Sequence, residues 1–491
     1  MQSTEITQLL CSILPQEAVE ADTWDPKRHG ADNPLLPQAA RPTHLVRPAD
    51  VAQLQKLVQM ANENLWSLTV SSSSGRHVKG GFNAKEPGIH VDLSGWNKIL
   101  WINRRNRVVM LEPGVTYGQL QEALRPHGMT VSMPLGPRGG KSVVAAVMDR
   151  EPGTWPNRQW DISDPVASTE FVFGNGALFR TGAAGGPGTL EQQRAVGGAQ
   201  KSPLGPSQAD FHRVIQGAQG TMGIVTWITM RCELLPAVQK PYVLKADTLD
   251  RLAPFVYTVE RPWLGEHAFV LDRTAAAMLL SGAGGRSFDT VYNALPRWMC
   301  LKNIAGFTRF PQQRVKYQEK DIQEMARHCG LEMLPGFGDI TATDFLEAAI
   351  RPCGEADWRH ALRGHCLSVF FLTTMDRVSG YVNLARDLAA SLDLAENRLG
   401  VYAQPVVQNH ACHVELLVPY NPGDEQDVQR AARFEARAVE KLLETGAFFS
   451  RPYGAAQDAA FGRNPQNTQL VKKIKHIFDP NKVLNRGKWD F

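Results

Sequence analysis

The stretch VSSSSGRHVKGG, residues 70–81, decides how the rest of this sequence is interpreted. A helical pattern over residues 51–64 leads into the apolar residues 68–70, which are typical of a short strand. The small hydroxyl residues and glycines that follow let backbone N–H groups converge on an anion. Three side chains of the loop can add positive charge: Arg76, His77 and Lys79. The loop therefore predicts a pyrophosphate site, although it matches neither G-x-G-x-x-G nor G-x-x-x-x-G-K-[ST].

Two strands and a helix follow this loop. Alternating apolar residues at 89–93 and the run RVVML at 107–111 predict the strands. The phrase EPGVTY at 112–117 then opens a helix over residues 119–124. Small-residue loops are common in proteins, so the prediction of a pyrophosphate site depends on the elements that follow the loop.

Seven phrases of the sequence, taken in order, resemble the vanillyl-alcohol oxidase and p-cresol methylhydroxylase (PCMH) superfamily of FAD enzymes. The same superfamily holds the glycolate and D-lactate dehydrogenases. The phrases span roughly half the chain, and seven in order form a specific signal where one alone would be weak. They are RPTHLVRPADV (41–51), the loop at 70–81, LEPGVTYGQL (111–120), GGKSVVAAVMDREPG (139–153), TEFVFGNGALFRTG (169–182), QGAQGTMGIVTW (216–227) and FDPNKVLNRGKW (478–489).

The resemblance implies an α+β fold: a two-part FAD-binding domain of the PCMH type and a cap domain with an antiparallel sheet and helices. The family phrases begin at Arg41, and the recognisable pattern is lost after a strand that ends near Pro236. The expected division is a lead-in (1–40), the FAD-binding domain (41–236), the substrate or cap domain (237–445) and a C-terminal segment that returns to the FAD-binding domain (446–491).

The composition indicates a soluble globular protein with more than one lobe, because the 491 residues are 43% hydrophobic and 21% charged. The net charge of +4 is small against 53 basic and 49 acidic residues, so no nucleic-acid partner is expected. We find no apolar run of membrane-spanning length and no secretory pattern at the N-terminus, and we therefore expect a cytoplasmic protein without a membrane span.

The seven cysteines are scattered and form neither a CxxC pair nor a CxxCH haem site. This argues against an iron–sulfur cluster or haem bound by this chain and favours reduced thiols. With no second redox centre in the chain, electrons taken by a flavin would pass to O₂ or to a separate acceptor protein. A homo-oligomer is compatible with the sequence.

The resemblance assigns FAD as the cofactor. It places the pyrophosphate at the loop 70–81, the isoalloxazine and ribityl along the turn 134–142, and the adenine or ribityl against the apolar segment 220–226. The alternative for each segment taken alone is an ordinary turn or a tight entry to a strand. The expected FAD-binding residues are Ser72, Ser73, Ser74, Gly75, Arg76, His77, Gly80, Pro134, Gly139, Gly140, Ser142, Gly220, Gly223, Ile224, Val225, Asn485 and Lys488.

His77 aligns loosely with the histidine that carries FAD covalently in berberine-bridge-like members. The alternative is a side chain that neutralises phosphate or caps a turn, and this is the interpretation we favour. We therefore expect FAD to be bound non-covalently, with His77 as the attachment site in the loop if the bond is covalent.

The phenol-oxidising branch of the superfamily binds its substrate with a Tyr–Arg pair late in the chain. Arg451 falls on the family arginine, and Tyr453 lies two residues after it instead of one before. The family's loop tyrosine is replaced by Lys79, and an acid found before the glycine turn in some members is Pro137. These departures argue against a simple 4-alkylphenol substrate.

The hydroxy-acid branch holds a divalent metal with a histidine pair and a later Glu-His. His413 best matches one histidine of the pair, but its partner falls on Val406 or Val407. His410 and His413 alone are a thin metal signal, since paired histidines on a strand are more often members of a polar network. No metal is expected.

The expected activity is FAD-dependent oxidation of a small molecule, an aromatic or phenolic alcohol or a 2-hydroxy acid, by hydride transfer from carbon to flavin N5. Arg451, with Lys79 as a second candidate, would hold a carboxylate or phenolate. Tyr453 or His413 would take the hydroxyl proton. Two alternatives stay open: a non-catalytic flavin-binding subunit that relays electrons or scaffolds a redox complex, and a non-redox member of the kind that acts in ether-lipid synthesis.

Overall fold

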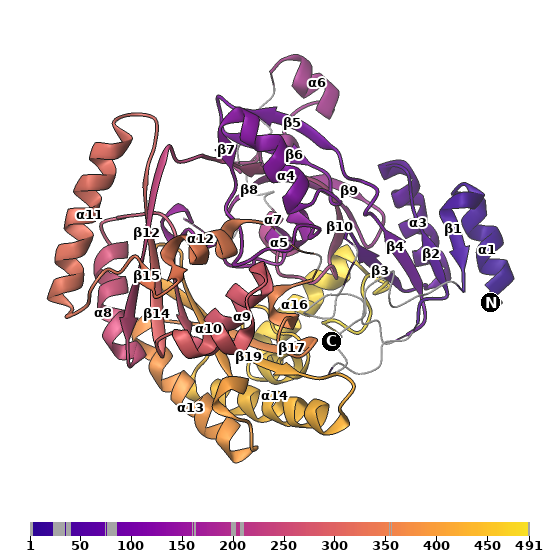
Figure 1. Ribbon diagram of the computed structural model, residues 1–491. Coiled ribbons are helices and arrows are strands. Elements are labelled where there is room, and N and C mark those ends of the chain that lie inside the picture. The colour runs from indigo at the N-terminus through magenta and orange to yellow at the C-terminus, as the bar shows by residue number, and fades with distance from the viewer. Residues whose placement is uncertain are drawn as a thin grey trace.

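The computed structural model describes residues 3–22, 35, 41–73, 75, 86–159, 161, 164–197, 203–206, 211–352, 354 and 356–489. The chain forms two lobes (Figure 1). One lobe is built from two small sheets and the helices beside them, and the other is built around a larger antiparallel sheet.

The first sheet carries the start of the serine-rich loop. Among the described residues its strands are ordered β1 (Val19–Ala21), β2 (His44–Val46), β4 (Ile89–Asp92) and β3 (Leu68–Ser71). β2 and β3 both pair parallel with β4. Helix α3 (Val51–Asn64) covers this sheet and begins at Asp50, whose side chain accepts a hydrogen bond from the Gln53 N–H. A chain that enters through α3 and β3 therefore places Ser71 to Ser73 at the carboxyl end of β3.

The second sheet is antiparallel and lies beside the first (Figure 1). In the described ranges its order is β5 (Ile99–Asn103), β6 (Val108–Leu111), β10 (Gly223–Arg231), β8 (Val166–Phe173) and β9 (Leu178–Arg180). Apolar residues of helices α4 (Tyr117–Leu124) and α5 (Val143–Met148) complete its core. This lobe also contains α1 (Ser3–Cys11), β7 (Met129–Thr130), η3 (Pro156–Arg158), α6 (Leu190–Ala195), α7 (His212–Ile215) and β11 (Glu233–Leu234).

The second lobe is organised by a six-stranded antiparallel sheet, as far as the described residues show. Its order is β12 (Val238–Ala246), β14 (Trp298–Gly306), β13 (Ala268–Asp272), β18 (Gly400–Val406), β19 (Ala411–Tyr420) and β17 (His365–Thr373). β18 and β19 pair with Gln404 opposite His413 and Tyr402 opposite Glu415. Since side chains alternate along a strand, these four residues lie on one face of the sheet.

Helices cover both faces of this sheet and bury two separate apolar clusters. One cluster includes residues of α8 (Leu249–Glu260), α11 (Pro311–His328), α13 (Val378–Ser391) and α14 (Glu425–Thr445). The other includes residues of α9 (Arg273–Gly284), α12 (Ala342–Ile350) and η5 (Trp358–His360). The further elements are α10 (Phe288–Ala294), β15 (Gly336–Phe337) and β16 (Ile340–Thr341).

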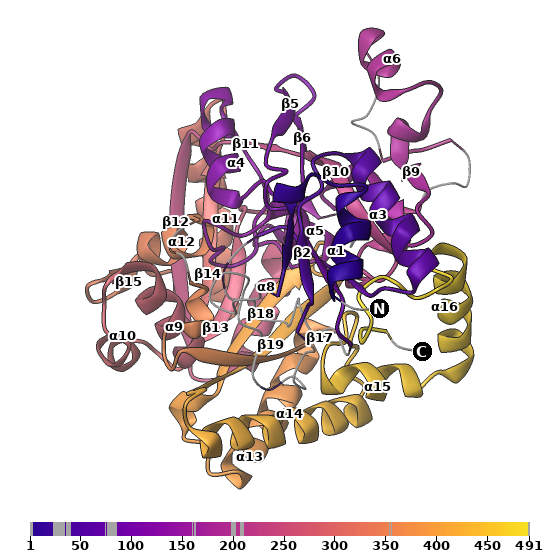
Figure 2. The ribbon, with the colours of Figure 1, turned by 90° about the vertical axis from the view of Figure 1, so that its right-hand side faces the viewer.

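The C-terminal segment runs back from the second lobe to the first. α15 (Ala455–Gly462) and α16 (Pro465–Phe478) follow α14 along the edge of the molecule (Figure 2). The Phe478 ring stacks on Phe173 of β8 with 4.1 Å between centroids. Beyond α16, Leu68 of β3 donates to the Val483 carbonyl at 2.7 Å, and the Asn485 N–H donates to the Leu68 carbonyl at 2.8 Å. The tail thus reaches the sheet that carries the loop.

None of the helices in the described part of the chain is long and apolar enough to cross a membrane.

Candidate active site

A cavity of about 310 Å³ lies where the two lobes meet and is lined by both. From the first lobe come Ser71 to Ser73, the turn at Pro134 to Arg138, the end of α5 and the start of β10. From the second lobe come Tyr402, His413 and Glu415 of the large sheet, together with Asp357 and Arg359 at η5. The C-terminal segment adds Tyr453, Asn485 and Lys488.

The start of the serine-rich loop at residues 70–81, here called the serine loop, lies at one end of the cavity. Ser72 and Ser73 line it directly. Gly75 has a φ of +92°, and a Cβ there would lie 2.2 Å from Nη1 of Arg138, so the arginine of the second turn lies against the loop. Five residues of this expected site lie outside the described residues: Ser74, Arg76, His77, Lys79 and Gly80.

The third backbone segment and the tail meet at the same end. Gly220, Gly223, Ile224 and Val225 line the cavity beside Asn485. Asn485 Nδ2 donates to the Gln219 carbonyl at 2.7 Å, and a Cβ on Gly220 would lie 2.5 Å from that nitrogen. Oδ1 of Asn485 is buried and has no hydrogen-bond partner among the residues that the structure describes. An acceptor of this kind is available to a ligand in the cavity.

The first part of the second glycine turn (residues 134–142) lines the cavity, and its last residues support the neighbouring helix. Pro134 lines the cavity, whereas Gly139, Gly140 and Ser142 are not among its lining residues in the described structure. Ser142 Oγ donates to the Pro113 carbonyl at 2.6 Å and accepts from the Ala145 N–H at 3.0 Å. Ser142 is therefore the N-cap of α5, and the helix that it starts carries Asp149 at its end.

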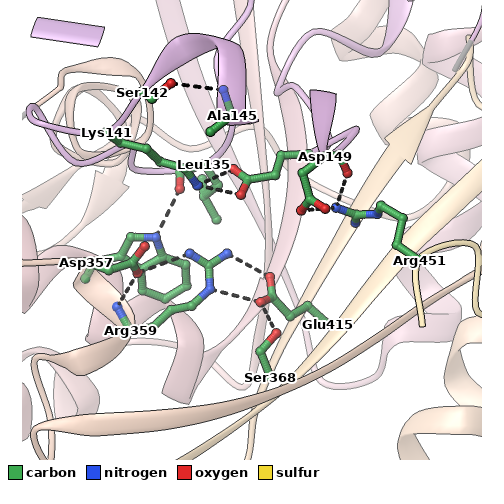
Figure 3. A network of polar contacts seen from close by, with 12 residues as sticks. Leu135, Lys141, Ser142, Ala145, Asp149, Asp357, Arg359, Ser368, Glu415 and Arg451 are labelled. Carbon is green, nitrogen blue, oxygen red and sulfur yellow. Dashed lines mark hydrogen bonds and ion pairs between the residues drawn. The ribbon is translucent and has the colours of Figure 1, made fainter. Parts of the chain in front are cut away.

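On the cap side, Arg359 is held by two carboxylates (Figure 3). Its Nε and Nη2 donate to Glu415 at 2.9 and 2.8 Å, and its Nη1 donates to Asp357 at 3.2 Å. Ser368 Oγ also donates to Glu415, and the guanidinium lies 4.4 Å from the Trp358 ring centroid. Burial alone would lower the pKa of Arg359, but Glu415 and Asp357 raise it well above its usual value.

A second ion pair lies opposite Arg359. Lys141 Nζ contacts both carboxylate oxygens of Glu151 at 2.5 Å. In Figure 3 the terminal edge of the Arg359 guanidinium is directed toward the side on which Lys141 lies. Burial raises the pKa of the Asp357 carboxyl, but Arg359, His360 and Lys141 outweigh it and leave that pKa below its usual value. Charged groups from both lobes thus converge on the same part of the cavity.

Arg451, expected to bind the substrate anion, is not among the cavity-lining residues. It is 3% exposed, and its Nη1 donates to the Asp149 carbonyl at 2.9 Å and to the Asp149 carboxylate at 3.2 Å. Tyr453 does line the cavity and donates its hydroxyl to the other oxygen of Asp149 at 2.5 Å. Burial first, and then the Asp149 carboxylate, raise the pKa of Tyr453 well above its usual value.

His413 lies on the floor of the cavity and is 3% exposed. Its Nε2 is 4.0 Å from Oε2 of Glu415, the carboxylate that also holds Arg359. The ring centroid lies 5.8 Å from that of Phe370 and 6.0 Å from that of Tyr402, so neighbouring strands fix its orientation. A carboxylate beside a histidine stabilises the protonated ring. No group of three or more His, Cys, Asp or Glu side chains within the described ranges is placed to hold a metal ion.

Residues 42–182 match the FAD binding domain family. The chain is 29% identical to the 4-cresol dehydrogenase flavoprotein subunit of Pseudomonas putida, an alignment that covers 93% of this chain and 89% of that protein. It is 26% identical to the mitochondrial cytochrome-linked D-lactate dehydrogenase of Arabidopsis thaliana, over 91% of this chain and 73% of the relative. The chain therefore contains an FAD-binding domain and resembles FAD-linked dehydrogenases over about nine tenths of its length. It is an FAD-dependent oxidoreductase.

The fold agrees with this similarity. A solved structure of 4-ethylphenol oxidase from Gulosibacter chungangensis, in complex with isoeugenol, superposes with a TM-score of 0.80 at 15% identity, covering 99% of this chain and 96% of the other. The prediction of an α+β flavoprotein of the PCMH type is confirmed.

The residues present fit FAD in this flavoprotein. The unpartnered oxygen of Asn485 and the positive φ of Gly75 lie at the serine-loop end of the cavity. Arg138 and Lys488 line the cavity as well and supply positive charge for a diphosphate.

Six charged residues that line the cavity, three from each lobe, were missed in the sequence: Lys141, Asp149, Glu151, Asp357, Arg359 and Glu415. Lys141, Asp149 and Glu151 stand inside the family phrase 139–153, which was a usable signal. Asp357 and Arg359 lie in a region without recognisable motifs, and Glu415 is two residues from His413 on the same strand face. That spacing of two is the one signal that could have drawn attention to Glu415.

Proposed function

We propose that the protein oxidises a small organic alcohol, an aromatic or phenolic alcohol or a 2-hydroxy acid, to the carbonyl compound. The C–H hydrogen leaves with its electron pair as hydride and the hydroxyl hydrogen leaves as a proton. When bound, FAD supplies the two-electron acceptor for this reaction, with N5 taking the hydride. The chain must therefore bind the substrate, hold its carbon in position and accept one proton.

The observation that carries this proposal is the pairing of His413 with Glu415 inside the cavity. A neutral imidazole can accept the hydroxyl proton, and the adjacent carboxylate stabilises the cation that results. Tyr453 is less suited to the task. Its hydroxyl donates to Asp149 and its pKa is raised. Tyr453 is therefore protonated and cannot take up the substrate proton.

Arg359 is the described cation best placed to orient the substrate. Glu415, Asp357 and the Trp358 ring fix its guanidinium, and three of its five N–H groups are engaged in the bonds given above. The remaining donors can bind a substrate oxygen. Arg451 supports the site through Asp149, and Lys79 keeps its proposed role as a second cation, outside the described residues.

The convergence of charged side chains from both lobes supports an enzyme over a non-catalytic flavin-binding subunit, for which an occluded or apolar cap is expected. We further propose that FAD is bound non-covalently and that electrons leave to O₂ or to an external acceptor protein. The division at residues 40, 236 and 445 is kept as the proposed domain organisation.

The test is anaerobic reduction of the bound flavin, followed as bleaching of its visible absorbance, against a panel of aromatic alcohols, alkylphenols and 2-hydroxy acids. His413→Gln should slow the reduction by ~10²-fold or more and remove the group that controls its pH dependence. His410→Gln is the matched control, because His410 is exposed in the turn that precedes the same strand. A His413→Gln enzyme with normal reduction rate would remove His413 from the mechanism.

A further inference from the structure

We propose that a buried ion pair in the C-terminal segment, Lys475 with Asp479, positions part of the FAD site. The pair holds the Asn485 side chain and the turn at residues 218–221 in the places from which they contact the cofactor. This inference concerns cofactor binding alone, so it goes beyond the proposed alcohol oxidation and does not depend on it. It is carried by hydrogen bonds that join the tail to two cavity-lining segments.

The ion pair is buried at the end of α16. Lys475 is 4% exposed and Asp479 is 0% exposed, and Lys475 Nζ lies 3.1 Å from Asp479 Oδ2. Neither residue is among those that line the cavity in the described structure. A buried ion pair is stable only when further hydrogen bonds satisfy both charged groups. The other contacts of the two side chains therefore show what the pair holds in place.

Asp479 fixes the turn that follows α16. Its Oδ1 accepts a hydrogen bond from the Val483 N–H at 2.8 Å, and its Oδ2 accepts one from the Leu484 N–H at 3.1 Å. Leu484 in turn pairs in parallel with Leu68 of β3. The carboxylate therefore sets where the tail joins the edge of the first sheet, one residue before Asn485.

Lys475 connects this tail to the turn that precedes β10. Its Nζ donates to the Thr221 carbonyl at 3.0 Å, and the Thr221 hydroxyl donates to the Ala218 carbonyl at 2.7 Å. Asn485 Nδ2 bonds the same turn at the Gln219 carbonyl. Because one ammonium group contacts both the turn and Asp479, the turn and the tail cannot shift independently.

The two connected segments present groups to the cavity. Gln219, Gly220 and Asn485 line it, and Asn485 Oδ1 has no hydrogen-bond partner among the described residues. Asn485 has a φ of +44°, in a region that residues other than glycine rarely adopt and that surrounding contacts must maintain. The Lys475–Asp479 pair supplies such contacts through the residues on either side of it. Loss of the pair should therefore remove a preorganised acceptor from the FAD site.

The test measures the dissociation constant of FAD by titrating the apoprotein and following flavin fluorescence. Lys475→Met keeps a long apolar side chain that can bond neither Asp479 nor the Thr221 carbonyl. The Kd of FAD should rise ~10-fold or more. Asp479→Asn, which keeps the size of the side chain and removes its charge, serves as a second variant if Lys475→Met does not fold, and its Kd should also rise. An unchanged Kd in the folded variant overturns the inference.

Arg398→Met is the matched control. Arg398 also joins a carboxylate to a backbone carbonyl, donating to Asp427 at 2.8 Å and to the Pro419 carbonyl at 2.7 Å, but it lies in the second lobe outside the cavity lining. Urea denaturation should show a loss of stability in Arg398→Met, whereas its Kd for FAD should change by less than ~2-fold. An equal rise of Kd in Arg398→Met and Lys475→Met would show that general destabilisation weakens FAD binding, and overturns the inference.

A double-mutant cycle distinguishes positioning from a purely structural role. If Lys475 acts through Asn485, then Lys475→Met should raise the Kd of FAD by no more than ~3-fold in an Asn485→Ala background. The full effect of Lys475→Met in both backgrounds overturns the inference. Failure of every alcohol to reduce the flavin would contradict the proposed function and would leave these binding measurements unaffected.

Flavin that stays on the denatured protein would contradict non-covalent binding alone. The same variants are then compared by iodide quenching of the bound-flavin fluorescence in the folded holoprotein. Quenching should increase in Lys475→Met, because the flavin site is less well ordered, and should not increase in Arg398→Met. Equal quenching in Lys475→Met and the wild type overturns the inference.

Discussion

Arg451, which the family resemblance suggested as the group that holds the substrate anion, makes its polar contacts with Asp149 in the structure. Its guanidinium is buried, and its contacts run to both the carbonyl and the carboxylate of Asp149. The ring of Phe370 lies 4.6 Å from the guanidinium carbon. These contacts assign Arg451 a supporting position behind the cavity wall, where it also balances the charge of Asp149.

Replacing Arg451 with Met should lower the free energy of unfolding by about 3 kcal/mol, since it leaves the Asp149 carboxylate beside a cavity without its cation. FAD content should be unchanged, because the serine loop and tail segments do not involve this arginine. Urea denaturation and the absorbance ratio of purified protein measure the two quantities. Arg297→Met removes an exposed pair with Glu396 and should cost under about 1 kcal/mol. Equal losses in the two variants would show that the Arg451 pair is no more stabilising than a surface pair.

Several of the cavity-lining residues expected from the sequence stand in phrases rich in glycine and small residues. Ser72, Ser73, Gly220 and Asn485 line the cavity, and each stands in a phrase whose glycines or small residues have a local physical meaning. Arg359 could not be located in this way. Its partner Glu415 is 56 residues away, and only the pairing of distant strands brings the two together.

At the scale of elements, the second glycine turn is connected to the cap by a tryptophan. Trp358 of η5 donates its Nε1–H to the Leu135 carbonyl at 3.0 Å, and the Gly136 N–H donates to the Ala349 carbonyl of α12 at 2.8 Å. Gly136 has a φ of +58°, and a Cβ there would lie 2.6 Å from Cδ1 of Trp358. Because Arg359 follows Trp358 directly, this contact also sets where the guanidinium enters the cavity.

Gly136→Ala should therefore destabilise the protein beyond the ordinary penalty for an alanine at positive φ. The added methyl group must displace a buried indole, which costs about 1–3 kcal/mol. Gly338→Ala is a matched control, since Gly338 has the same φ of +58° and a Cβ there would meet no atom within 4 Å. The difference between the unfolding temperatures of the two variants measures the steric cost of the added methyl group at residue 136. If the two midpoints fall equally, the turn accommodates the methyl group and the tryptophan contact is not tight.

Periodic helices were predictable, and the sheet that they cover was not. The amphipathic patterns over α11, α13 and α14 are local, so helices of this kind can be inferred from a short stretch of sequence. The order β12, β14, β13, β18, β19, β17 depends on pairings between strands far apart in the chain. Short apolar runs such as β17 and β19 fit several partners equally well, so their register cannot be inferred from pattern alone.

At the scale of the whole molecule, a buried polar cluster joins the two lobes beside the cavity. His267, just before β13, accepts or donates a hydrogen bond with Thr154 Oγ1 at 2.9 Å, and its ring centroid lies 4.9 Å from that of Trp155. Arg158 of η3 makes two hydrogen bonds to Glu266, at 3.2 and 3.1 Å. The segment that carries Asp149 and Glu151 into the cavity is thus fixed to the cap by its next few residues.

Because His267 lies buried in this junction, the free energy of unfolding should fall as the pH is lowered. Burial first, and then the positive charge of Lys302, lower the pKa of His267 to about 3 from 6.5. As pH falls below 6.5 the unfolded imidazole binds a proton, whereas the folded one stays neutral until about pH 3. Stability is therefore lost progressively across that interval as the solution becomes more acidic.

Between pH 7 and pH 5, His267 should account for about 2 kcal/mol of lost stability. Urea denaturation of the wild type and of His267→Gln at both pH values measures this contribution as the difference between their losses. Burial raises the pKa of Asp272 to about 6 and that of Glu435 to about 7, which acts in the opposite direction. Both carboxyls are present in both proteins, so their effects cancel in the comparison.

His328→Gln, on the exposed side of α11, should behave as the wild type does. If His267→Gln loses as much stability as the wild type, then His267 is protonated in the folded protein well above pH 3. The junction between the lobes would then accommodate a positively charged imidazole.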